Sequence, residues 1–403
     1  MKKLTYCVIL AFFVILSTIN GSGKPYVLLV SYDGFRWDYL NRGITPNLEN
    51  VKQNGVSALS LRPSFPSKTF PNHQSIITGM YIENHGIISN YFKDDFSGKT
   101  YGMKDTASIR NARWYLGEAF WETAERNGII SASYFWPGSE MHLDYRRPTY
   151  YQYYEHTLPY EKKVAGVMEW LQLPQDKRPH FITLYFHETD TYGHEFGTNS
   201  EETNNAVKLL DKITGYILDE LDKIKMKDSV NVIFVSDHGM ADISSERVVN
   251  IEEMIENYNC KFNDDGPFMQ INPPEDKCME VYSILKKNEN HYKVYLKEEM
   301  PSYFHYNKNP FIYSIIVIAD MGWSLVGNKK SDWYANTKGN HGYDNNHTDM
   351  HGIFLATGPA FKSGYKTGTL WNIDIYPLLC KIFDIYPRSN IDGNIERIEF
   401  ILK

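Results

Sequence analysis

The sequence of 403 residues has little cysteine, no excess of positive charge and a single long apolar run, and each shortage excludes a class of protein. With 4 cysteines and no Cys-x-x-Cys spacing, it is neither a disulfide-dense scaffold nor a cysteine-built metal module. Cys7 lies in the N-terminal segment expected to be removed as a signal peptide, and Cys380, in an apolar helical pattern, is expected to be a buried thiol. Cys260 and Cys278 flank a loop rich in proline, aspartate and glycine, and they are candidates for one disulfide in an oxidising compartment.

The charge balance is slightly acidic, because 42 Lys and Arg residues face 49 Asp and Glu residues and give a formal net charge of −7. Binding to nucleic-acid duplexes needs clustered Lys and Arg side chains, so we expect no such binding here. A small-molecule substrate that carries phosphate would need metal ions or a few placed donors to meet its charge. The hydrophobic content of 42% is enough for the core of one large α/β domain.

The one long apolar run is at the N-terminus. Lys2 and Lys3 precede the apolar run Val8–Leu16, and the small residues Gly21-Ser22-Gly23 follow it. This order is typical of a secretory signal peptide, which we expect to occupy residues 1–23 and to be cleaved. A membrane span needs ~20 apolar residues, so the alternative of an uncleaved anchor is less favoured. We therefore expect a secreted or periplasmic protein with no stable membrane anchor, and a single catalytic domain over residues 24–403.

From Lys24 onward, short apolar runs alternate with amphipathic stretches, which is typical of a largely parallel sheet flanked by helices. The expected strands are Tyr26–Val30, Ile130–Phe135, Phe181–Phe186, Val232–Val235 and Ile353–Ala356. The expected helices are Asn72–Thr78, Arg113–Arg126, Glu161–Leu171 and Glu202–Ile224. The last helix has an apolar stripe at core-facing spacing, made of Val207, Leu210, Ile213, Ile217 and Leu221.

The pattern changes between about 243 and 340, where turn residues, prolines and aromatics become more frequent. Short alternating strands fit Lys293–Leu296 and Ile312–Ile318. We interpret this stretch as a smaller α+β subdomain inserted in the α/β fold, with the main sheet resuming at His351.

Three aspartates each follow a predicted buried strand: Asp33, Asp190 and Asp237. Ligands of open α/β sheets bind at the carboxyl ends of the strands, so these carboxylates should converge. Like charges raise each other's pKa, and three bare carboxylates therefore need cations to share one crevice.

Histidines complete a candidate metal site. Asp190 and His194 are four residues apart, so one helical turn would aim both at one point, and His238 is adjacent to Asp237. Aspartate with neutral histidine suits Zn²⁺ better than Mg²⁺, and the set is rich enough for two ions. The alternative is that these residues are helix caps and surface ion pairs.

The segment Pro66–His73 joins the strand-like run Val56–Leu61 to the helix expected near Asn72. Thr69 at that helix N-terminus has two interpretations. One is a helix cap. The other is a nucleophile, because helix N-termini bind phosphate and a bound metal ion lowers the pKa of a hydroxyl. The neighbouring metal-ligand candidates favour the nucleophile.

Together these motifs resemble the nucleotide pyrophosphatase/phosphodiesterase family of the alkaline phosphatase superfamily. They are TFPNHxSxxTGxYxxxHGI (Thr69 to Ile87), Trp136-Pro-Gly, the DxxxH from Asp190 to His194, SDHGM (Ser236 to Met240) and GNHGYDN (Gly339 to Asn345). The resemblance extends from about Lys24 to Phe361. It implies an alkaline phosphatase-like fold and a hydrolase of nucleotide phosphodiester and pyrophosphate bonds, for example of ATP to AMP and diphosphate.

The resemblance also implies roles for single residues. One Zn²⁺ would be held by Asp190, His194 and His341, and a second by Asp33, Asp237, His238 and the hydroxyl of Thr69. His347 and His351 compete with His341 on spacing, and the family motif favours His341. Asn90 would contact a phosphate oxygen. The family's nucleobase slot would fall on the aromatics Phe70, Trp114, Tyr134 and Tyr185, and Lys93 and Lys99 are weaker candidates for phosphate contacts.

The implied reaction passes through a covalent threonine–nucleotidyl intermediate, formed and hydrolysed in two steps, in a protein expected to be monomeric. Alternatives remain within and outside this activity. A sulfatase would need Cys or Ser before Pro-x-Arg, which Thr69-Phe70-Pro71-Asn72 lacks, and an alkaline phosphatase would present a Ser nucleophile. A choline-phospholipid phosphodiesterase of the same family and a catalytically silent zinc-binding member stay open.

Overall fold

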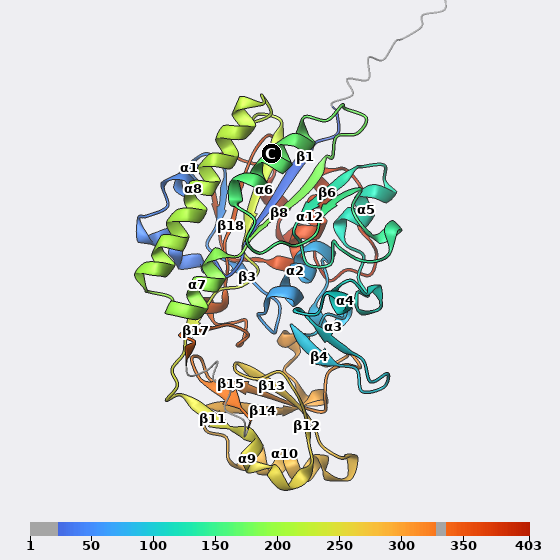
Figure 1. Cartoon of the computed structure of the whole chain (residues 1–403), viewed down its shortest axis with the longest axis vertical. Coiled ribbons are helices and arrows are strands. Elements are labelled where there is room, and N and C mark those ends of the chain that lie inside the picture. Colours follow the sequence, from blue (N-terminus) through green and yellow to red (C-terminus); the bar gives the residue numbers. More distant parts are fainter. Residues whose placement is uncertain (1–22, 328–335) are drawn as a thin grey trace, which may run out of the picture.

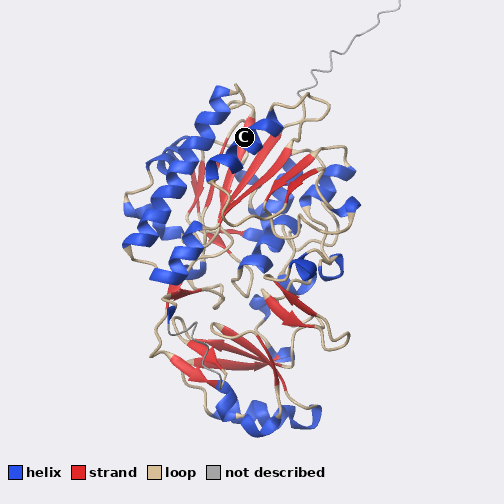
Figure 2. Cartoon of the chain, viewed as in Figure 1, coloured by secondary structure: helices blue, strands red, loops and turns tan. Residues whose placement is uncertain are grey.

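The computed structural model describes residues 23–327 and 336–403. The predicted signal peptide therefore lies outside the described residues, apart from Gly23. Two sheets organise the chain (Figures 1 and 2): a large one surrounded by helices and a small one at the opposite end of the molecule. Among the described residues, no helix combines the length and the apolar character that a membrane crossing requires.

The large sheet has eight strands in the order β19-β2-β18-β9-β1-β8-β6-β7. Their bounds are β1 Tyr26–Tyr32, β2 Val56–Ala58, β6 Ser131–Tyr134, β7 Tyr150–Gln152, β8 Phe181–Phe186, β9 Val230–Val235, β18 Phe354–Thr357 and β19 Tyr365–Thr367. All neighbours pair in parallel except β18, which is antiparallel to both β9 and β2. The largely parallel α/β sheet expected from the sequence is confirmed.

Helices cover both faces of this sheet because alternate side chains of a strand point to opposite sides. Val27 and Leu29 of β1 belong to the core cluster that contains α2, α5 and α12, whereas Leu28 and Val30 belong to the one with α1, α6 and α8. Within the described residues, the α-helices are α1 Pro46–Asn54, α2 Thr69–Thr78, α3 Ile82–His85, α4 Thr106–Ile109, α5 Phe120–Arg126, α6 Tyr160–Leu171, α7 Glu188–Phe196, α8 Glu201–Lys223, α9 Ile251–Met254, α10 Cys278–Lys287 and α12 Ile375–Ile382.

The single helix predicted over Arg113–Arg126 is wrong, because a short 3-10 helix (Ala112–Trp114) and α5 are separated there by a loop over residues 115–119. Gly117 packs so closely that a Cβ there would lie 2.9 Å from the Cγ2 of Thr78. The backbone N–H of Ala119 donates to Glu122 Oε1 at 3.1 Å, which starts the helix at Phe120. The strand-like run Val56–Leu61 is likewise divided into β2 and β3 (Leu61–Arg62).

The small sheet is antiparallel, in the order β12-β13-β15-β14, with bounds β12 Lys261–Asn263, β13 Phe268–Asn272, β14 Tyr292–Leu296 and β15 Ile315–Ala319. One face packs on α9 and α10, which lie at the far end of the molecule in Figure 1. The other face presents Phe268, Ile316 and Ile318 to the part of the chain that contains Phe65 and Ile87. A second hydrophobic cluster thus joins the small sheet to the rest of the molecule.

Short ladders complete the fold: β10 Ala241–Asp242 with β17 Gly339–Asn340, β11 Val248–Asn250 with β16 Ser324–Val326, β20 Leu370–Trp371 with β3, and β4 Tyr91–Lys93 with β5 Thr100–Gly102. The β10·β17 ladder pairs the chain where it enters and leaves the small sheet. The three cysteines of the described residues are free thiols, so the disulfide considered for Cys260 and Cys278 is not formed, and Cys380 is buried as expected.

Candidate active site

Three neighbouring parallel strands carry the three predicted aspartates to one edge of the large sheet. Asp33 directly follows β1, and its backbone N–H donates to Phe186 O at the end of β8 at 2.9 Å. One residue, Ser236, separates Asp237 from the end of β9, and Asp190 lies in the first turn of α7 after β8. The structure therefore brings the three aspartates together at the carboxyl ends of parallel strands, as expected.

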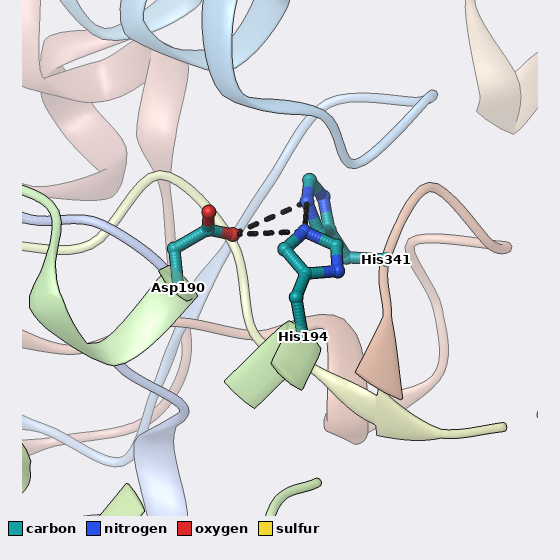
Figure 3. A group of neighbouring side chains, drawn as sticks. All are labelled: Asp190, His194 and His341. Carbon is teal, nitrogen blue, oxygen red and sulfur yellow. Dashed lines mark hydrogen bonds and ion pairs between the residues drawn. The ribbon is translucent and has the colours of Figure 1, made fainter. Parts of the chain in front are cut away.

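The first group of side chains is Asp190, His194 and His341 (Figure 3). Asp190 Oδ1 lies 3.3 Å from His194 Nε2 and 3.3 Å from His341 Nε2. The two Nε2 atoms are 3.1 Å apart. Because α7 presents both Asp190 and His194 on one face, only His341 has to come from elsewhere, and it follows β17.

The second group is Asp33, Asp237 and His238, all buried. His238 Nε2 lies 3.3 Å from Asp33 Oδ1 and 3.2 Å from Asp237 Oδ2. The hydroxyl of Thr69 is 3.2 Å from the same Nε2. The rings of His238 and His341 stack with centroids 3.5 Å apart, so the two groups are adjacent parts of one cluster.

Backbone carbonyls fix the three histidine rings. Nδ1 of His194 contacts Gly339 O, Nδ1 of His238 contacts Gly239 O and Nδ1 of His341 contacts Ser67 O, each at 2.8 Å. A carbonyl can only accept, so each Nδ1 carries a proton, and in the neutral ring Nε2 is the nitrogen whose lone pair points at the cluster. A ring nitrogen held in this way is the usual arrangement of a histidine metal ligand.

The carboxylate oxygens that face these lone pairs need a positive charge between them. Asp33 Oδ1, Asp190 Oδ1 and Asp237 Oδ2 are buried and accept no hydrogen bond from the described part of the chain. Orphaned acceptors of this kind are costly in a protein interior. Three imidazole nitrogens and three carboxylate oxygens that point inward fit two cations, and the mixed nitrogen and oxygen donors suit zinc.

The electrostatics of the ion-free cluster agree with this conclusion. Burial, together with the carboxylates of Asp237 and Asp190, raises the pKa of Asp33 to about 7. Burial would lower the pKa of His238, but the carboxylates of Asp237 and Asp33 raise it to about 10. The cluster attracts positive charge strongly, and a divalent cation meets that demand better than one proton.

Thr69 is the first residue of α2, with Lys68 as the N-cap. Thr69 lies at the positive end of the α2 dipole, which favours a phosphate, although Pro71 has no N–H and the N–H groups of Phe70 and Asn72 already donate to Asn90 Oδ1 and Lys68 O. Asn90 is close by, because its Oδ1 accepts from the backbone N–H of Phe70 at 3.0 Å. That contact fixes the amide of Asn90, whose Nδ2 donates no hydrogen bond to the part of the chain that the structure describes.

A cavity of about 200 Å³ lies beside the first group. Its lining includes two histidines of the first group, the predicted phosphate contact Asn90 and Asp265 from the loop between β12 and β13; the full set is Lys68, Asn90, Met103, His194, Asp265, Asn340 and His341. The cavity therefore gives a ligand access to the histidines of the first group.

The four aromatics assigned to a nucleobase slot have different environments. Phe70 is partly exposed and meets Tyr101 edge to face, and Tyr185 donates its hydroxyl to Asp33 Oδ2 at 2.5 Å. Trp114 is 1% exposed, between Phe92 and Phe311. This packing does not bring Trp114 to the cluster.

Tyr134 is also buried, at 8% exposure, and packs against α6, where a Cβ on Gly166 would lie 2.4 Å from its ring. Of the rival histidines, His351 uses both ring nitrogens, on Ser60 Oγ at 2.8 Å and Asn345 O at 3.1 Å. His347 is exposed. His341 is thus the histidine that the structure brings to Asp190.

The lysines considered for phosphate contacts lie elsewhere. Lys93 is on β4 with its ammonium 3.9 Å from Asp95, and Lys99 is exposed in the hairpin that follows. Neither is among the residues that line the cavity.

Sequence reasoning missed three residues that support the cluster. Ser67 holds His341 through its carbonyl, and His73 lies with Nδ1 3.3 Å from Asp237 Oδ2 and 2.8 Å from Thr69 O. Tyr154, 45% exposed, stands edge to face against Tyr185. His73 was within the quoted motif, whereas nothing in the local sequence distinguishes Tyr154 from the other 29 tyrosines (of 30).

Comparisons with known proteins agree with this geometry. The family model described as type I phosphodiesterase / nucleotide pyrophosphatase matches residues 27–344. The chain belongs to this family. As a type I phosphodiesterase / nucleotide pyrophosphatase, it is a hydrolase of phosphodiester bonds with an alkaline phosphatase-like fold.

Among its relatives is a bis(5'-adenosyl)-triphosphatase of Xenopus laevis, which is 36% identical over 384 residues, 95% of this chain and 83% of the relative. Human ectonucleotide pyrophosphatase/phosphodiesterase family member 5 is 36% identical over 360 residues, 89% of this chain and 74% of the relative. A murine structure of member 5, an inactive threonine-to-alanine variant in complex with AMP, superposes with a TM-score of 0.89 at 33% identity, covering 94% of this chain and 100% of that one.

Proposed function

We propose that this protein is a zinc-dependent phosphodiesterase and nucleotide pyrophosphatase in which Thr69 is the nucleophile. The observation that carries the proposal is the position of the Thr69 hydroxyl, 3.2 Å from His238 Nε2, at the N-terminus of α2. A helix cap would turn this hydroxyl back to its own helix, yet the N-cap of α2 is Lys68. Thr69 instead faces the cluster of inward-pointing ligand atoms.

The cations have defined ligands in this proposal. Asp190, His194 and His341 hold one Zn²⁺, and Asp33, Asp237 and His238 hold the other, with the Thr69 hydroxyl beside it. When bound, the two ions lower the pKa of the threonine hydroxyl and neutralise charge that develops on the phosphoryl group and on the leaving oxygen.

The chain's own residues provide orientation and the covalent step. Asn90, fixed by the Phe70 backbone, donates from its amide to a non-bridging phosphate oxygen. Thr69 Oγ1 bonds to phosphorus as the bond to the leaving group breaks, and one water later hydrolyses the threonine ester. Two in-line displacements predict net retention of configuration at phosphorus.

Nucleotides are the substrates that the surroundings favour. Phe70, Tyr185 and the exposed ring of Tyr154 offer aromatic surface near the cluster, and a stacked base gains ~1–3 kcal/mol. The AMP bound in the related murine structure supports a nucleoside monophosphate as the retained group. We leave the buried Trp114 and Tyr134 out of this surface.

The proposal also covers the domain organisation, the location and the oligomeric state of the protein. Residues 24–403 form one catalytic domain that carries a subdomain at about 243–340. The protein is exported after removal of residues 1–23 and acts as a monomer on small molecules.

A substrate panel tests the function directly. The purified protein is given ATP, a diadenosine polyphosphate, a dinucleotide and a choline lysophospholipid, with and without a zinc chelator. We expect nucleoside monophosphate from the nucleotides and a loss of at least ~10³-fold in kcat for Thr69→Ala. The matched control is Thr78→Ala at the other end of α2, whose hydroxyl donates to Gln74 O at 2.7 Å. Release of phosphocholine alone, or full activity of Thr69→Ala, would contradict the proposal.

A further inference from the structure

One carboxylate of the inserted segment contacts both segments that carry the proposed chemistry. Asp264 lies in the loop between β12 and β13. Its Oδ1 pairs with the ammonium of Lys68, and its Oδ2 accepts a hydrogen bond from the hydroxyl of Ser89. Both ends of the ion pair are nearly buried, with the side chains of Lys68 and Asp264 only 10% and 8% exposed.

The two partners of Asp264 are adjacent in sequence to the residues that matter most. Lys68 directly precedes Thr69, and Ser89 directly precedes Asn90. The backbone N–H of Phe70 donates to Asn90 Oδ1 at 3.0 Å, which closes the connection between the two segments. Asp264 therefore fastens together the loop of the nucleophile and the start of the strand that holds the predicted phosphate contact.

The Lys68 side chain is held along its whole length. Its ammonium lies 5.0 Å from the centre of the Phe268 ring, which also belongs to the small sheet. Its stem packs against Gly342, where a Cβ would lie 3.0 Å from Lys68 Cε, and Gly342 directly follows His341. A lysine fixed in this way is a poor candidate for a mobile phosphate ligand and a good candidate for a structural clamp.

We infer that Asp264 is a positioning residue, which acts from the small sheet through Lys68 and Ser89 to set the distance between the Thr69 hydroxyl and the Asn90 amide. This inference rests on the proposed function. A displacement of about 1 Å in a reacting group can lower turnover by ~10²-fold, so a clamp on both segments has a measurable effect on the rate.

If Asp264 only stabilised the contact between the small sheet and the rest of the molecule, loss of another such contact would lower the rate as much. Asp95 makes such a contact and allows this comparison. Asp95 also joins the two parts of the molecule, since it accepts from Lys261 on β12 at 3.0 Å and from Asn272 on β13 at 3.2 Å. It follows the β4 strand and contacts neither Lys68 nor Ser89 among the described interactions. Asp95→Asn thus weakens another, more exposed ion pair between the small sheet and the rest of the molecule without touching the contacts of Asp264.

The test compares Asp264→Asn with Asp95→Asn in the full chain loaded with zinc, with a nitrophenyl nucleotide diester as substrate. We expect kcat of Asp264→Asn to fall about 10- to 100-fold with little change in KM, while Asp95→Asn keeps its kcat within about two-fold. Zinc content and melting temperature are measured on both variants. The inference is wrong if folded Asp264→Asn keeps its kcat, or if Asp95→Asn loses as much.

Three more variants keep the test decisive: Lys68→Met alone, Lys68→Met combined with Asp264→Asn, and Ser89→Ala. Lys68→Met combined with Asp264→Asn should be no slower than the slower single variant, because both remove the same contact, whereas multiplying losses would contradict the clamp. If Asp264→Asn does not fold, Ser89→Ala decides, since it leaves the ion pair intact. A loss of about 3- to 10-fold in its kcat supports the inference and an unchanged kcat overturns it. Wild-type protein without hydrolysis would instead refute the proposed function.

Discussion

Three consecutive residues, Ser67, Lys68 and Thr69, reach three different parts of the site. The carbonyl of Ser67 holds His341 of the first group, and the hydroxyl of Thr69 lies against His238 of the second. Lys68 between them is paired with Asp264 of the small sheet. A tripeptide with all three members held is already organised for its ligands before they bind, which is how catalytic groups are kept within tenths of an ångström.

Tyr185→Phe tests whether this tyrosine supports the metal ligands or stacks on a base. The change removes the hydroxyl that donates to Asp33 Oδ2 and keeps the ring. Loss of such a contact typically lowers metal affinity by ~10–100-fold. We expect the variant to lose zinc at lower chelator concentration than the wild type, with Tyr192→Phe on the exposed side of α7 as the control. Unchanged zinc retention and an unchanged rate would assign Tyr185 to stacking alone.

For single residues, the sequence predicted where the site residues lie in the fold better than it predicted their side-chain contacts. Asp33, Asp190 and Asp237 were located from the ends of buried strands, because the edge of a parallel sheet follows from strand order alone. The direction of Tyr185 and the burial of Trp114 depend on side-chain torsions and on partners distant in sequence. Neither is encoded in a local pattern.

Among the elements, α8 follows its sequence pattern most closely. Val207, Leu210, Ile213, Ile217 and Leu221 are at most 1% exposed, all on the face that meets the large sheet. An apolar stripe of this width stabilises a long helix through packing rather than through propensity.

Leu210→Ala should lower the free energy of unfolding by about 2–5 kcal/mol, because it leaves a cavity in this packed face. Denaturant unfolding of the metal-loaded protein measures the change. The control is Lys208→Ala, two residues earlier on the exposed side of α8, where we expect less than ~0.5 kcal/mol. Equal effects of the two changes would mean that α8 is not packed as described.

The elements that the sequence predicted poorly depend on long-range structure. The orientation of β18, antiparallel to its neighbours, follows from a connection that returns through the small sheet and cannot be deduced from a buried apolar run. The error over Arg113–Arg126 has a similar cause, since Gly117 fits against Thr78 only once α2 is in place. Continuous apolar strands such as β1, β8 and β9 were predicted because burial on both faces leaves a strong local signal.

At the scale of the whole molecule, the cluster of candidate metal ligands is built from segments between residues 33 and 341, which only the complete fold brings together. An ion that binds the folded state and not the unfolded chain adds RT ln(1 + [L]/Kd) to stability, about 2.7 kcal/mol at a hundred-fold excess over Kd.

Chelation should therefore abolish turnover and lower the melting temperature by roughly 5 °C, and added zinc should restore both. Elemental analysis of the purified protein should give about two zinc ions per chain, as expected of a two-metal site. Magnesium added in place of zinc is the control and should restore neither property, because histidine nitrogen is a poor ligand for it. Full activity of metal-free protein would contradict the proposed role of the cluster.

The short β10·β17 ladder has a consequence for how this protein can diverge. Ala241 pairs with Asn340, so the chain enters and leaves the small sheet at adjacent points, and His341 follows immediately. Gly339 lies so close to the backbone of α7 that a Cβ would be 2.3 Å from Gly193 O, and its carbonyl holds His194. Because the ladder fixes both ends of the segment that it encloses, changes in that segment away from Asp264 can reshape the rim of the cavity and leave the proposed metal ligands where they are. Substrate preference can thus diverge through the rest of the segment as long as the contacts of Asp264 with Lys68 and Ser89 are kept.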